Sequence, residues 1–455
     1  MDLGIKDKVA LVLASSKGLG KAVALELAKE GAKVIICGTD ETALNAAKAE
    51  IEIFAPNQVA AIICNLTDEK QRKILIDESV KVFGPIEILV TNAGGPAAGP
   101  FEQFNLEDWK HTLLQSFKES NATEGISLYI HLPFCESLCT FCGCNKRITK
   151  RHEVEDPYIT AVIKEWKLYC DLFPRKPIIK EIHLGGGTPT FFSPENLERL
   201  MNGIFQYATK AEEHEFSFEG HPNNTTRHHL QTLYDLGFRR VSFGVQDYSP
   251  KVQEAIHRIQ PFHNVAKVTF WAKEIGYTSV GHDLIFGLPF QTLADVKDTI
   301  DKTKSLQPDR LAFYSYAHVP WIKGNGQRGF KDDDLPKDDE KRMLYEEGKK
   351  QLAQNGYHEI GMDHFALEND SMFTSFKEGK LHRNFMGYTA SKTQLMIGLG
   401  VSSISDSWYS FAQNEKTIED YYTHLAEDQL PVFRGHALTP EDLIIRKHIL
   451  NLMCQ

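Results

Sequence analysis

The chain has 455 residues, enough for about two or three domains. Its composition, 42% hydrophobic and 25% charged, supports a large apolar core, so neither disulfides nor a metal is needed merely to fold. The net charge of −10 argues against a nucleic-acid partner, because binding to phosphates requires a basic surface. The sequence opens without a secretory signal, and no apolar run reaches the ~18–20 residues of a membrane span. We therefore expect a cytoplasmic protein with no membrane contact.

Apolar, strand-like runs alternate with helix-like stretches over residues 1–117. Gly18 and Gly20 follow the first run and open a helix, an arrangement that places backbone N–H groups beside a pyrophosphate. The pattern predicts the start of a Rossmann-like parallel sheet, with strands at 8–14, 32–38, 59–65 and 86–95.

Two motifs in this region, at residues 14–20 (ASSKGLG) and 91–95 (TNAGG), resemble the short-chain dehydrogenase/reductases, particularly the 3-oxoacyl reductases. Ala14 stands where the family has its first glycine. The resemblance ends near residue 117, before the family's catalytic Ser and Tyr-x-x-x-Lys. Tyr388 and Lys392 have that spacing, but they lie in a segment that matches another family, so we interpret the spacing as coincidence. We expect a truncated fragment in which NAD(P) is not functional.

The polar stretch 118–126 predicts a junction between two domains. Beyond it, strand-like and helix-like segments alternate and predict a partial (β/α)6 barrel over 127–330, which residues 331–455 extend. The strands are expected at 127–134, 179–187, 214–220, 239–246, 279–287 and 309–318. Polar residues fall at or just after the strands' C-terminal ends, the rim that carries the active site in barrels: Cys135, Gly186, Gly187, Thr188, Glu219, Gln246, Asp283 and His318.

Cys135, Cys139 and Cys142 supply three thiolates from one short loop after an apolar strand. Thiolates suit iron–sulfur clusters or zinc, and in a reducing compartment they favour a metal site over disulfides. Three ligands would leave one iron of a four-iron cluster open. Zinc remains an alternative, although structural zinc usually takes two separated ligand pairs.

This loop resembles that of the radical S-adenosylmethionine (SAM) enzymes, in which SAM binds the open iron of a 4Fe–4S cluster. Residues 118–455 are similar to one of their families, the oxygen-independent coproporphyrinogen III oxidases. The matching stretches include LYIHLPFCESLCTFCGCNK, HLGGGTPT, RRVSFGVQDYSPKVQEAIHR, DLIFGLP, YAHVP, IGMDHFA, HRNFMGYT and LGVSSIS. A fourth cysteine, Cys144, separates this family from the related haem-chaperone branch.

The resemblance implies a role for each matching residue. Cys135, Cys139 and Cys142 would bind the cluster, and Cys144 would lie near it as a catalytic residue without being a ligand. Tyr129, a second catalytic candidate, would flank SAM. The remaining residues would contact SAM, including a second SAM molecule: Phe141, Gly186, Gly187, Thr188, Glu219, Gln246, Arg258, Asp283, Ala317 and Ile404.

The implied reaction converts two propionates of coproporphyrinogen III to vinyl groups, giving protoporphyrinogen IX in haem biosynthesis. It needs an electron donor of the flavodoxin or ferredoxin type, and we expect a monomer. A substrate with four carboxylates needs cations, and Arg383 is our candidate, with an ordinary surface arginine as the alternative reading.

Two other functions stay open: an NAD(P)-dependent reductase built on the first fragment, and a non-catalytic, cluster-bearing protein that binds haem or SAM. The family's own sequence continues past the position of Gln455, and the final run 442–455 is apolar without a polar finish. We therefore expect a fused and truncated chain, whose activity is a separate question from what its site is built to do.

Overall fold

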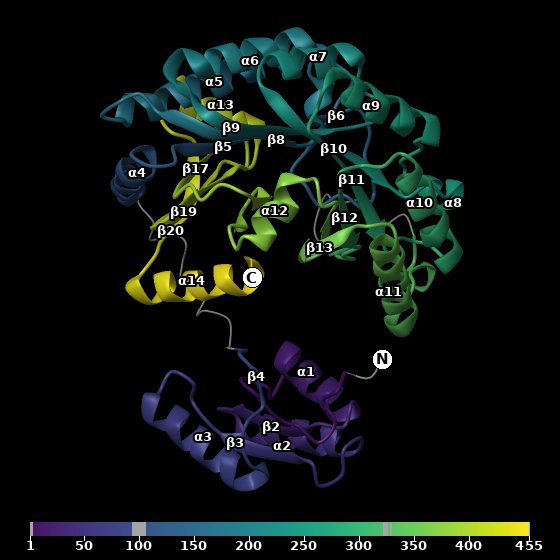
Figure 1. Ribbon diagram of the computed structural model, residues 1–455. Helices are drawn as coiled ribbons and strands as arrows, with labels where there is room; N and C mark the ends of the chain where they lie inside the picture. The colour runs from purple at the N-terminus through teal and green to yellow at the C-terminus, as the bar shows by residue number, and fades with distance from the viewer. Residues whose placement is uncertain (1–2, 93–105, 322–325, 328–329, 455) are drawn as a thin grey trace. The chain divides into compact units, whose positions relative to one another are not determined.

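A computed structural model describes residues 3–92, 106–321, 326–327 and 330–454. The chain divides into two compact units, Met1–Pro100 and Phe101–Gln455, each with a sheet of its own (Figure 1). In the part of the chain that the structure describes, no helix is long and apolar enough to cross a membrane.

The first unit contains a parallel sheet with strand order β3-β2-β1-β4, which confirms the predicted Rossmann-like fragment. Its strands are apolar along their length, as expected where helices cover both faces of a parallel sheet. The strands are β1 (Val9–Val12), β2 (Lys33–Gly38), β3 (Val59–Ile63) and β4 (Ile88–Val90). The helices are α1 (Gly18–Lys29), α2 (Glu41–Glu52) and α3 (Glu69–Phe83).

The glycine turn of this unit is closely packed. Ala14 has a φ of 45°, a left-handed conformation that explains why glycine is usual at this position. The Asn92 side-chain amide donates to the Ala14 carbonyl at 3.0 Å, and a Cβ at Gly20 would lie 2.5 Å from both groups. Asn92 therefore ties the end of β4 to the turn, while the rest of the predicted motif, Ala93 to Gly95, lies outside the described residues.

The second unit is built on six neighbouring parallel strands, counted over its described residues, with strand order β5-β8-β9-β10-β11-β12. Each predicted strand segment overlaps one of them, so the partial (β/α)6 barrel is confirmed. The strands are β5 (Ile126–Leu132), β8 (Ile178–Gly186), β9 (Thr209–Gly220), β10 (Phe238–Gln246), β11 (Ser279–Phe286) and β12 (Arg310–Ser315). The helices that follow them are α5 (Glu155–Leu172), α6 (Pro194–Tyr207), α7 (Arg227–Asp235), α8 (Pro250–Ala255), α9 (Phe262–Ile275), α10 (Leu293–Ser305) and α11 (Asp338–Gln354).

Further strands extend this sheet at both ends. Beside β12 lie the antiparallel strands β14 (His364–Ala366) and β13 (His358–Gly361). Beside β5, β17 (Leu395–Leu399) runs parallel and leads into an antiparallel series, β18 (Ile404–Ser407), β19 (Ser410–Asn414) and β20 (Val432–Ala437). The C-terminal segment also contains α12 (Ser371–Lys377), α13 (Ile418–Ala426) and the hairpin of β15 (His382–Asn384) with β16 (Gly387–Thr389).

Helix α4 (Leu106–Asn121) belongs to the second compact unit, so this unit begins before the end of the predicted sequence fragment at residue 117. Trp109, Leu113 and Phe117 are fully buried in the main core of that unit, and the Phe117 ring stacks on Phe173 with centroids 3.9 Å apart. The units divide after Pro100, and the predicted junction at 118–126 is the last turn of α4 followed by the start of β5.

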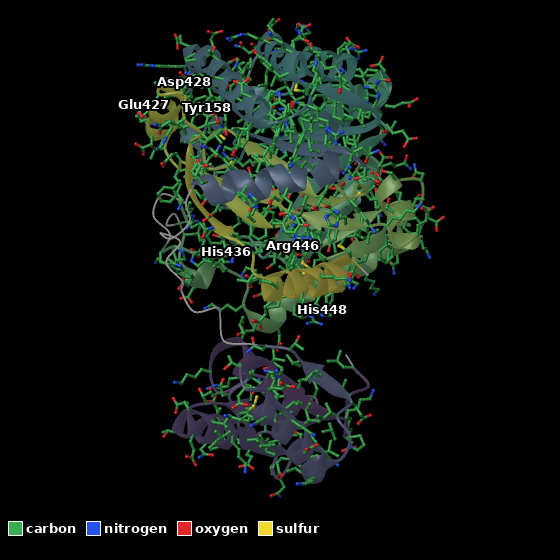
Figure 2. All side chains as sticks on the ribbon, turned by 90° about the vertical axis from the view of Figure 1, so that its left-hand side faces the viewer. Tyr158, Glu427, Asp428, His436, Arg446 and His448 are labelled. Atoms are coloured by element: carbon green, nitrogen blue, oxygen red, sulfur yellow. The ribbon has the colours of Figure 1, made fainter. Side chains whose placement is uncertain are left out.

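The final helix, α14 (Pro440–Cys454), is attached to the extended sheet by an arginine (Figure 2). Arg446 Nη1 donates to the Ser407 carbonyl at 2.7 Å, and its Nη2 forms an ion pair with Asp406. Its guanidinium also lies 4.9 Å from the centre of the Trp408 ring. The arginine therefore joins the helix to β18 and to the turn that follows it.

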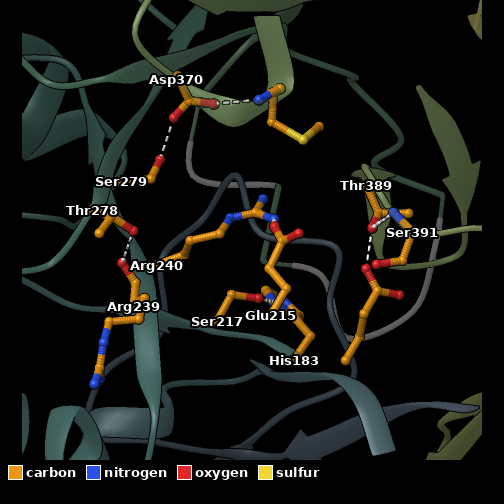
Figure 3. A network of polar contacts seen from close by, with 12 residues as sticks. His183, Glu215, Ser217, Arg239, Arg240, Thr278, Ser279, Asp370, Thr389 and Ser391 are labelled. Carbon is orange, nitrogen blue, oxygen red and sulfur yellow. Dashed lines mark hydrogen bonds and ion pairs between the residues drawn. The ribbon is translucent and has the colours of Figure 1, made fainter. Parts of the chain in front are cut away.

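Charged and polar side chains fill the inner face of the barrel near the N-terminal ends of its strands (Figure 3). Glu181 of β8 accepts a hydrogen bond from Ser127 Oγ at 2.6 Å and another from Thr389 of β16. Arg240 of β10 forms an ion pair with Glu215 of β9. Because each charge has a partner, the network can stay in the interior.

Asp370, which belongs to the C-terminal segment, also contributes to these polar contacts (Figure 3). Its carboxylate accepts a hydrogen bond from Ser279 of β11 and lies 3.5 Å from Arg310 Nε of β12. Residues that follow the six strands thus seal the barrel at the end opposite the predicted site.

Candidate functional site

The cysteine loop leaves the sheet through a short strand. Cys135 ends β6 (Phe134–Cys135), which pairs with β7 (Arg147–Ile148), so both ends of the loop are tied together. In the middle of the loop, the Thr140 N–H donates to the Ile256 carbonyl at 3.0 Å. The loop is therefore held against the end of α8 as well as by its own base.

All four cysteines of this loop, Cys135, Cys139, Cys142 and Cys144, line one cavity of about 310 Å³. Burial raises the pKa of Cys135 to about 11, despite the Thr188 hydroxyl 3.3 Å from its sulfur. A hydrogen bond with Cys144 lowers the pKa of Cys142 to about 6, while the same contact raises that of Cys144. Cys142 is thus the thiolate of this pair and Cys144 the thiol.

The described side chains include no group of three or more His, Cys, Asp or Glu residues placed to hold a single metal ion. Yet Cys135, Cys139 and Cys142 face the same cavity. A four-iron cluster takes each thiolate on a different iron, whereas tetrahedral zinc needs all its ligands around one point. The arrangement favours the cluster over zinc.

Most of the other predicted site residues line the same cavity. The strand ends of β8, β9, β10 and β11 converge there, as the sequence pattern predicts for this rim of a barrel. The predicted residues that line the cavity beside the cysteines are Phe141, Gly186, Gly187, Thr188, Glu219, Gln246, Arg258 and Asp283.

Gly187 brings the end of β8 into contact with the segment that precedes the cysteine loop. Its N–H donates to the Leu132 carbonyl at 2.9 Å, and a Cβ at this position would lie 2.6 Å from the Pro133 backbone. Gly186 has a φ of 110°, which other residues rarely adopt. A side chain at Gly186 would collide with the His131 ring and one at Gly187 with the Pro133 backbone, so both glycines are needed where the end of β8 meets this segment.

Gln246 and Arg258 are fixed around the end of β10. Gln246 has a φ of 69°, and Arg258 Nη2 donates to the Gly244 carbonyl at 2.6 Å. Arg258 Nη1 also donates to the Cys139 sulfur at 3.6 Å. The arginine therefore links the end of a barrel strand to one of the three predicted cluster ligands.

Two carboxylates face the cavity from neighbouring strands. Asp283 Oδ1 accepts a hydrogen bond from Ser242 Oγ at 2.8 Å, and burial raises the pKa of Asp283 to about 6. Glu219 Oε1 lies 3.4 Å from His183 Nε2. Neither carboxylate has an arginine or lysine ion pair among the described residues, so both can accept hydrogen bonds from a ligand.

Tyr129 lies behind this cavity and does not line it. Its hydroxyl is 3.1 Å from His131 Nδ1, and His131 Nε2 is 2.9 Å from the Asn145 carbonyl in the cysteine loop. Burial lowers the pKa of His131, so its ring is neutral. The sequence analysis missed His131, although its position two residues after Tyr129 in one strand places both side chains on the same face.

Ala317, Ile404 and His318 also stand apart from the cavity. The Ala317 carbonyl accepts from the Gln327 side-chain amide at 3.1 Å, and Ile404 begins the antiparallel strand β18. His318 Nε2 lies 3.1 Å from Asp332 Oδ1. The prediction that Ala317 and Ile404 contact SAM therefore gains no support from the cavity lining.

Gln327 is a second residue that the sequence analysis missed. Its amide donates to the carbonyl of Phe141, inside the cysteine loop, as well as to Ala317 after β12. Its Oε1 accepts from the Val319 N–H at 2.6 Å. One buried side chain thus joins the cysteine loop to the chain that leaves the last parallel strand of the barrel.

Tyr388 and Lys392, which have the Tyr-x-x-x-Lys spacing, are not on a helix. Tyr388 lies in β16, and the residues that follow it are not helical, so the two side chains do not share a face as they would four residues apart in a helix. The Tyr388 hydroxyl donates to the Met453 carbonyl at 2.8 Å and accepts from the Met362 N–H at 3.0 Å. The tyrosine has a structural role here.

Comparisons with known proteins follow the same division of the chain. A family model for short chain dehydrogenases matches residues 8–118, and a model for the radical SAM superfamily matches residues 129–303. The fold and the cysteine site of the second unit thus define a radical SAM protein.

The oxygen-independent coproporphyrinogen III oxidase of Synechocystis is 38% identical over 361 residues, which are 79% of this chain and 76% of that protein. The Escherichia coli K12 enzyme of the same name is 40% identical over 332 residues, 72% of each chain. The solved structure of an E. coli coproporphyrinogen III oxidase, described as a radical SAM enzyme, superposes with a TM-score of 0.73 at 38% identity and covers 78% of this chain and 80% of that one. This chain belongs to the oxygen-independent coproporphyrinogen III oxidase family.

Proposed function

We propose that the second unit is an oxygen-independent coproporphyrinogen III oxidase that uses a 4Fe–4S cluster and SAM. The observation that carries the proposal is the single cavity lined by the cysteine loop and the ends of four successive barrel strands. In the proposed reaction, each of two propionates loses a hydrogen atom, CO2 and one electron and becomes a vinyl group. The electron passes to an acceptor, and an electron donor of the flavodoxin or ferredoxin type remains a prediction.

The residues around the cavity suit these cofactors. Cys135, Cys139 and Cys142 would hold the cluster, since their thiols face one space and do not form a single-ion site within the described residues. Gly186 and Gly187 offer backbone groups, which suits the polar methionine end of SAM. When bound, the cluster and SAM supply the one-electron chemistry with which a radical SAM enzyme abstracts a hydrogen atom.

The chain's own side chains orient the ligand and set the charge around it. Glu219 and Asp283 can accept hydrogen bonds from ribose hydroxyls, because both are unpaired with any described arginine or lysine. Arg258 places a positive charge beside Cys139, one of the proposed cluster ligands. Two SAM molecules, the catalytic roles of Tyr129 and Cys144, and a monomeric state remain predictions.

The test uses the full chain, reconstituted anaerobically with iron and sulfide and reduced with dithionite. We expect brown protein that forms 5′-deoxyadenosine from SAM and, with coproporphyrinogen III, vinyl products detected by chromatography. Cys142→Ala should lose the colour and the activity, whereas Cys144→Ala should keep the colour, because Cys144 is not proposed as a ligand. Cluster-loaded, reduced protein that forms no 5′-deoxyadenosine would contradict the proposal, and haem binding without SAM cleavage would favour a non-catalytic binder.

A further inference from the structure

Arg383 of the β15–β16 hairpin has a buried N–H group without a partner. Its guanidinium lies 4.6 Å from the centre of the Tyr388 ring, across the hairpin. Nη1 is shielded from solvent, and no described residue accepts a hydrogen bond from it. A buried, charged donor that is left unpaired costs free energy, so binding of a water, an ion or a ligand at Nη1 would be favourable.

A row of ring contacts leads from Arg383 into the barrel. The Tyr388 ring meets the His364 ring edge-on, with centroids 5.1 Å apart, and His364 Nε2 lies 3.1 Å from the Tyr314 hydroxyl. Burial, together with the charge of Arg383, lowers the pKa of His364 to about 4. The side chain of His364, which lies in this row between Arg383 and Tyr314, is therefore neutral at pH 7.

Tyr314, the last residue of this row, lies on the same inner face of the barrel as Asp283. Asp283 pairs with Ala312 in the parallel ladder, and Tyr314 follows two residues later on β12. Residues two apart in a strand point to the same face, so Tyr314 and Asp283 share the barrel interior. Burial raises the pKa of Tyr314, the charges of Asp283 and Glu219 raise it further, and the charge of Arg383 lowers it. Tyr314 thus stands between the carboxylates of the cofactor cavity and the unpaired arginine.

Asp363 is an acidic residue of the protein that could form an ion pair with Arg383. The arginine's charge acts on Asp363, yet no ion pair joins the two side chains in the described structure. Asp363 lies in the turn between β13 and β14, next to His364, whereas Arg383 is held on Tyr388. The guanidinium is therefore already oriented and has no described anion beside its buried Nη1.

We infer that Arg383 binds a carboxylate of the substrate, with Nη1 as one donor of the guanidinium fork. The inference rests on the proposed function, which supplies a substrate with four carboxylates. A planar guanidinium matches a carboxylate with two parallel hydrogen bonds, which lysine cannot do. Bound in this way, one propionate would fix the ring system so that another faces the cofactor cavity. Arg383 acts as a specificity and positioning residue.

The experiment measures binding of coproporphyrin III, the fluorescent oxidised form of the substrate, to the reconstituted full chain. The variants are Arg383→Gln, which removes the charge and the fork, and Arg383→Lys, which keeps the charge alone. Arg342→Gln is the matched control, because Arg342 is exposed on α11 and its ion pair among the described residues is with Glu346. The tetramethyl ester of coproporphyrin III, which carries no carboxylate, is the ligand control.

We expect Arg383→Gln to bind coproporphyrin III about tenfold or more weakly, the scale of a lost charged hydrogen bond. Arg383→Lys should recover only part of that affinity, and Arg342→Gln should bind like the wild type. The ester should bind all four proteins alike. SAM cleavage without substrate should be unchanged in the Arg383 variants, because the residue does not line the cofactor cavity.

Equal binding of coproporphyrin III by the wild type and Arg383→Gln would overturn the inference while leaving the proposed function intact. If the wild type itself neither cleaves SAM nor binds coproporphyrin III, the proposed function fails instead. Should Arg383→Gln not fold, as judged by its iron content and circular dichroism, Arg383→Lys decides. If Arg383→Lys binds coproporphyrin III with full affinity, the two parallel hydrogen bonds of the guanidinium do not contribute to binding.

Discussion

Thr112 Oγ1 of α4 and Ser410 Oγ of β19 lie 2.6 Å apart, although 298 positions separate the two residues in the chain. The short chain dehydrogenase model matches residues up to 118, so this helix carries the sequence of one family while it packs in the unit that belongs to another. Its buried face is contributed by Trp109, Leu113 and Phe117, which recur every four residues. The core of the second unit therefore includes sequence from the first family.

Replacing Trp109 should destabilise the second unit. The side chain is fully buried, so Trp109→Ala should lower the free energy of unfolding by about 3–5 kcal/mol. Urea unfolding followed by circular dichroism measures this loss. Trp321→Ala is the control, because Trp321 is 74% exposed and its loss should change stability by less than about 0.5 kcal/mol. If both variants unfold at the same urea concentration as the wild type, α4 is not part of this core.

Replacing Gln327 should loosen the cysteine loop. Gln327→Ala removes two donated hydrogen bonds and one accepted one, each worth about 1 kcal/mol net, and frees the Phe141 carbonyl. The reconstituted variant should lose iron to a chelator faster than the wild type and need more SAM for half-maximal cleavage. Gln231→Ala is the control, since Gln231 is exposed and, among the described residues, its side chain bonds to Asp235 on its own helix. Identical iron loss in all three proteins would contradict this role.

Asp283 should make stability depend on pH. Burial raises its pKa from 3.8 to about 6, so the folded state binds the extra proton between these values and the unfolded state does not. The stability that it contributes is therefore full below about pH 4 and is lost as the pH rises through 6. Because Asp283 faces the cavity and is partly exposed, we expect a loss on the order of 1–2 kcal/mol.

Asp283→Asn removes this titration. The variant should be more stable than the wild type at pH 8 by about 1–2 kcal/mol, and the difference should shrink towards pH 5. Urea unfolding at both pH values checks the prediction. A constant difference would show that the titration of Asp283 does not affect stability. The variant should also bind SAM more weakly, since a neutral amide replaces the carboxylate that accepts hydrogen bonds.

Variants of Tyr388 and Lys392 should show whether these two residues have a structural or a catalytic role. Tyr388→Phe removes the hydroxyl that joins Met362 to Met453, so stability should fall by about 1–2 kcal/mol. Lys392→Ala should change stability little, because Lys392 is exposed. Neither change should affect oxidation of NADPH in the presence of a ketone substrate. A reductase activity that disappears in Lys392→Ala would show that the spacing is functional after all.

The parallel strands of the barrel could be predicted because strand-like and helix-like segments alternate along the chain, although polar side chains such as Glu181 and Arg240 also occur within the strands. Cys135 was predicted because it follows the first of these strand segments, whereas Asp283 lies inside β11 (Ser279–Phe286) and not at its end. The place of α4 could not be predicted in the same way. An amphipathic pattern shows that Trp109 and Leu113 are buried, but it does not show against which sheet.

Gln327 shows a second limit of the sequence. It lies 186 positions from Phe141, and a glutamine that bonds two backbone carbonyls leaves no motif, because the partners' side chains take no part. Arg383 illustrates the opposite case. Its residue type suggested a carboxylate ligand, but only the structure shows that Nη1 is buried and unpaired among the described residues.

The inward-facing side chains of the barrel include Tyr129, Ser217, Ser242 and Arg310, so the interior is polar from the sealed end to the cofactor cavity. An empty space lined in this way holds water bound to its walls. A tetrapyrrole that enters must displace that water, and the apolar parts of its ring cannot replace the lost hydrogen bonds. The ring's polar groups must do so. In such a barrel, the polar groups at the edge of the ring therefore determine which tetrapyrrole binds.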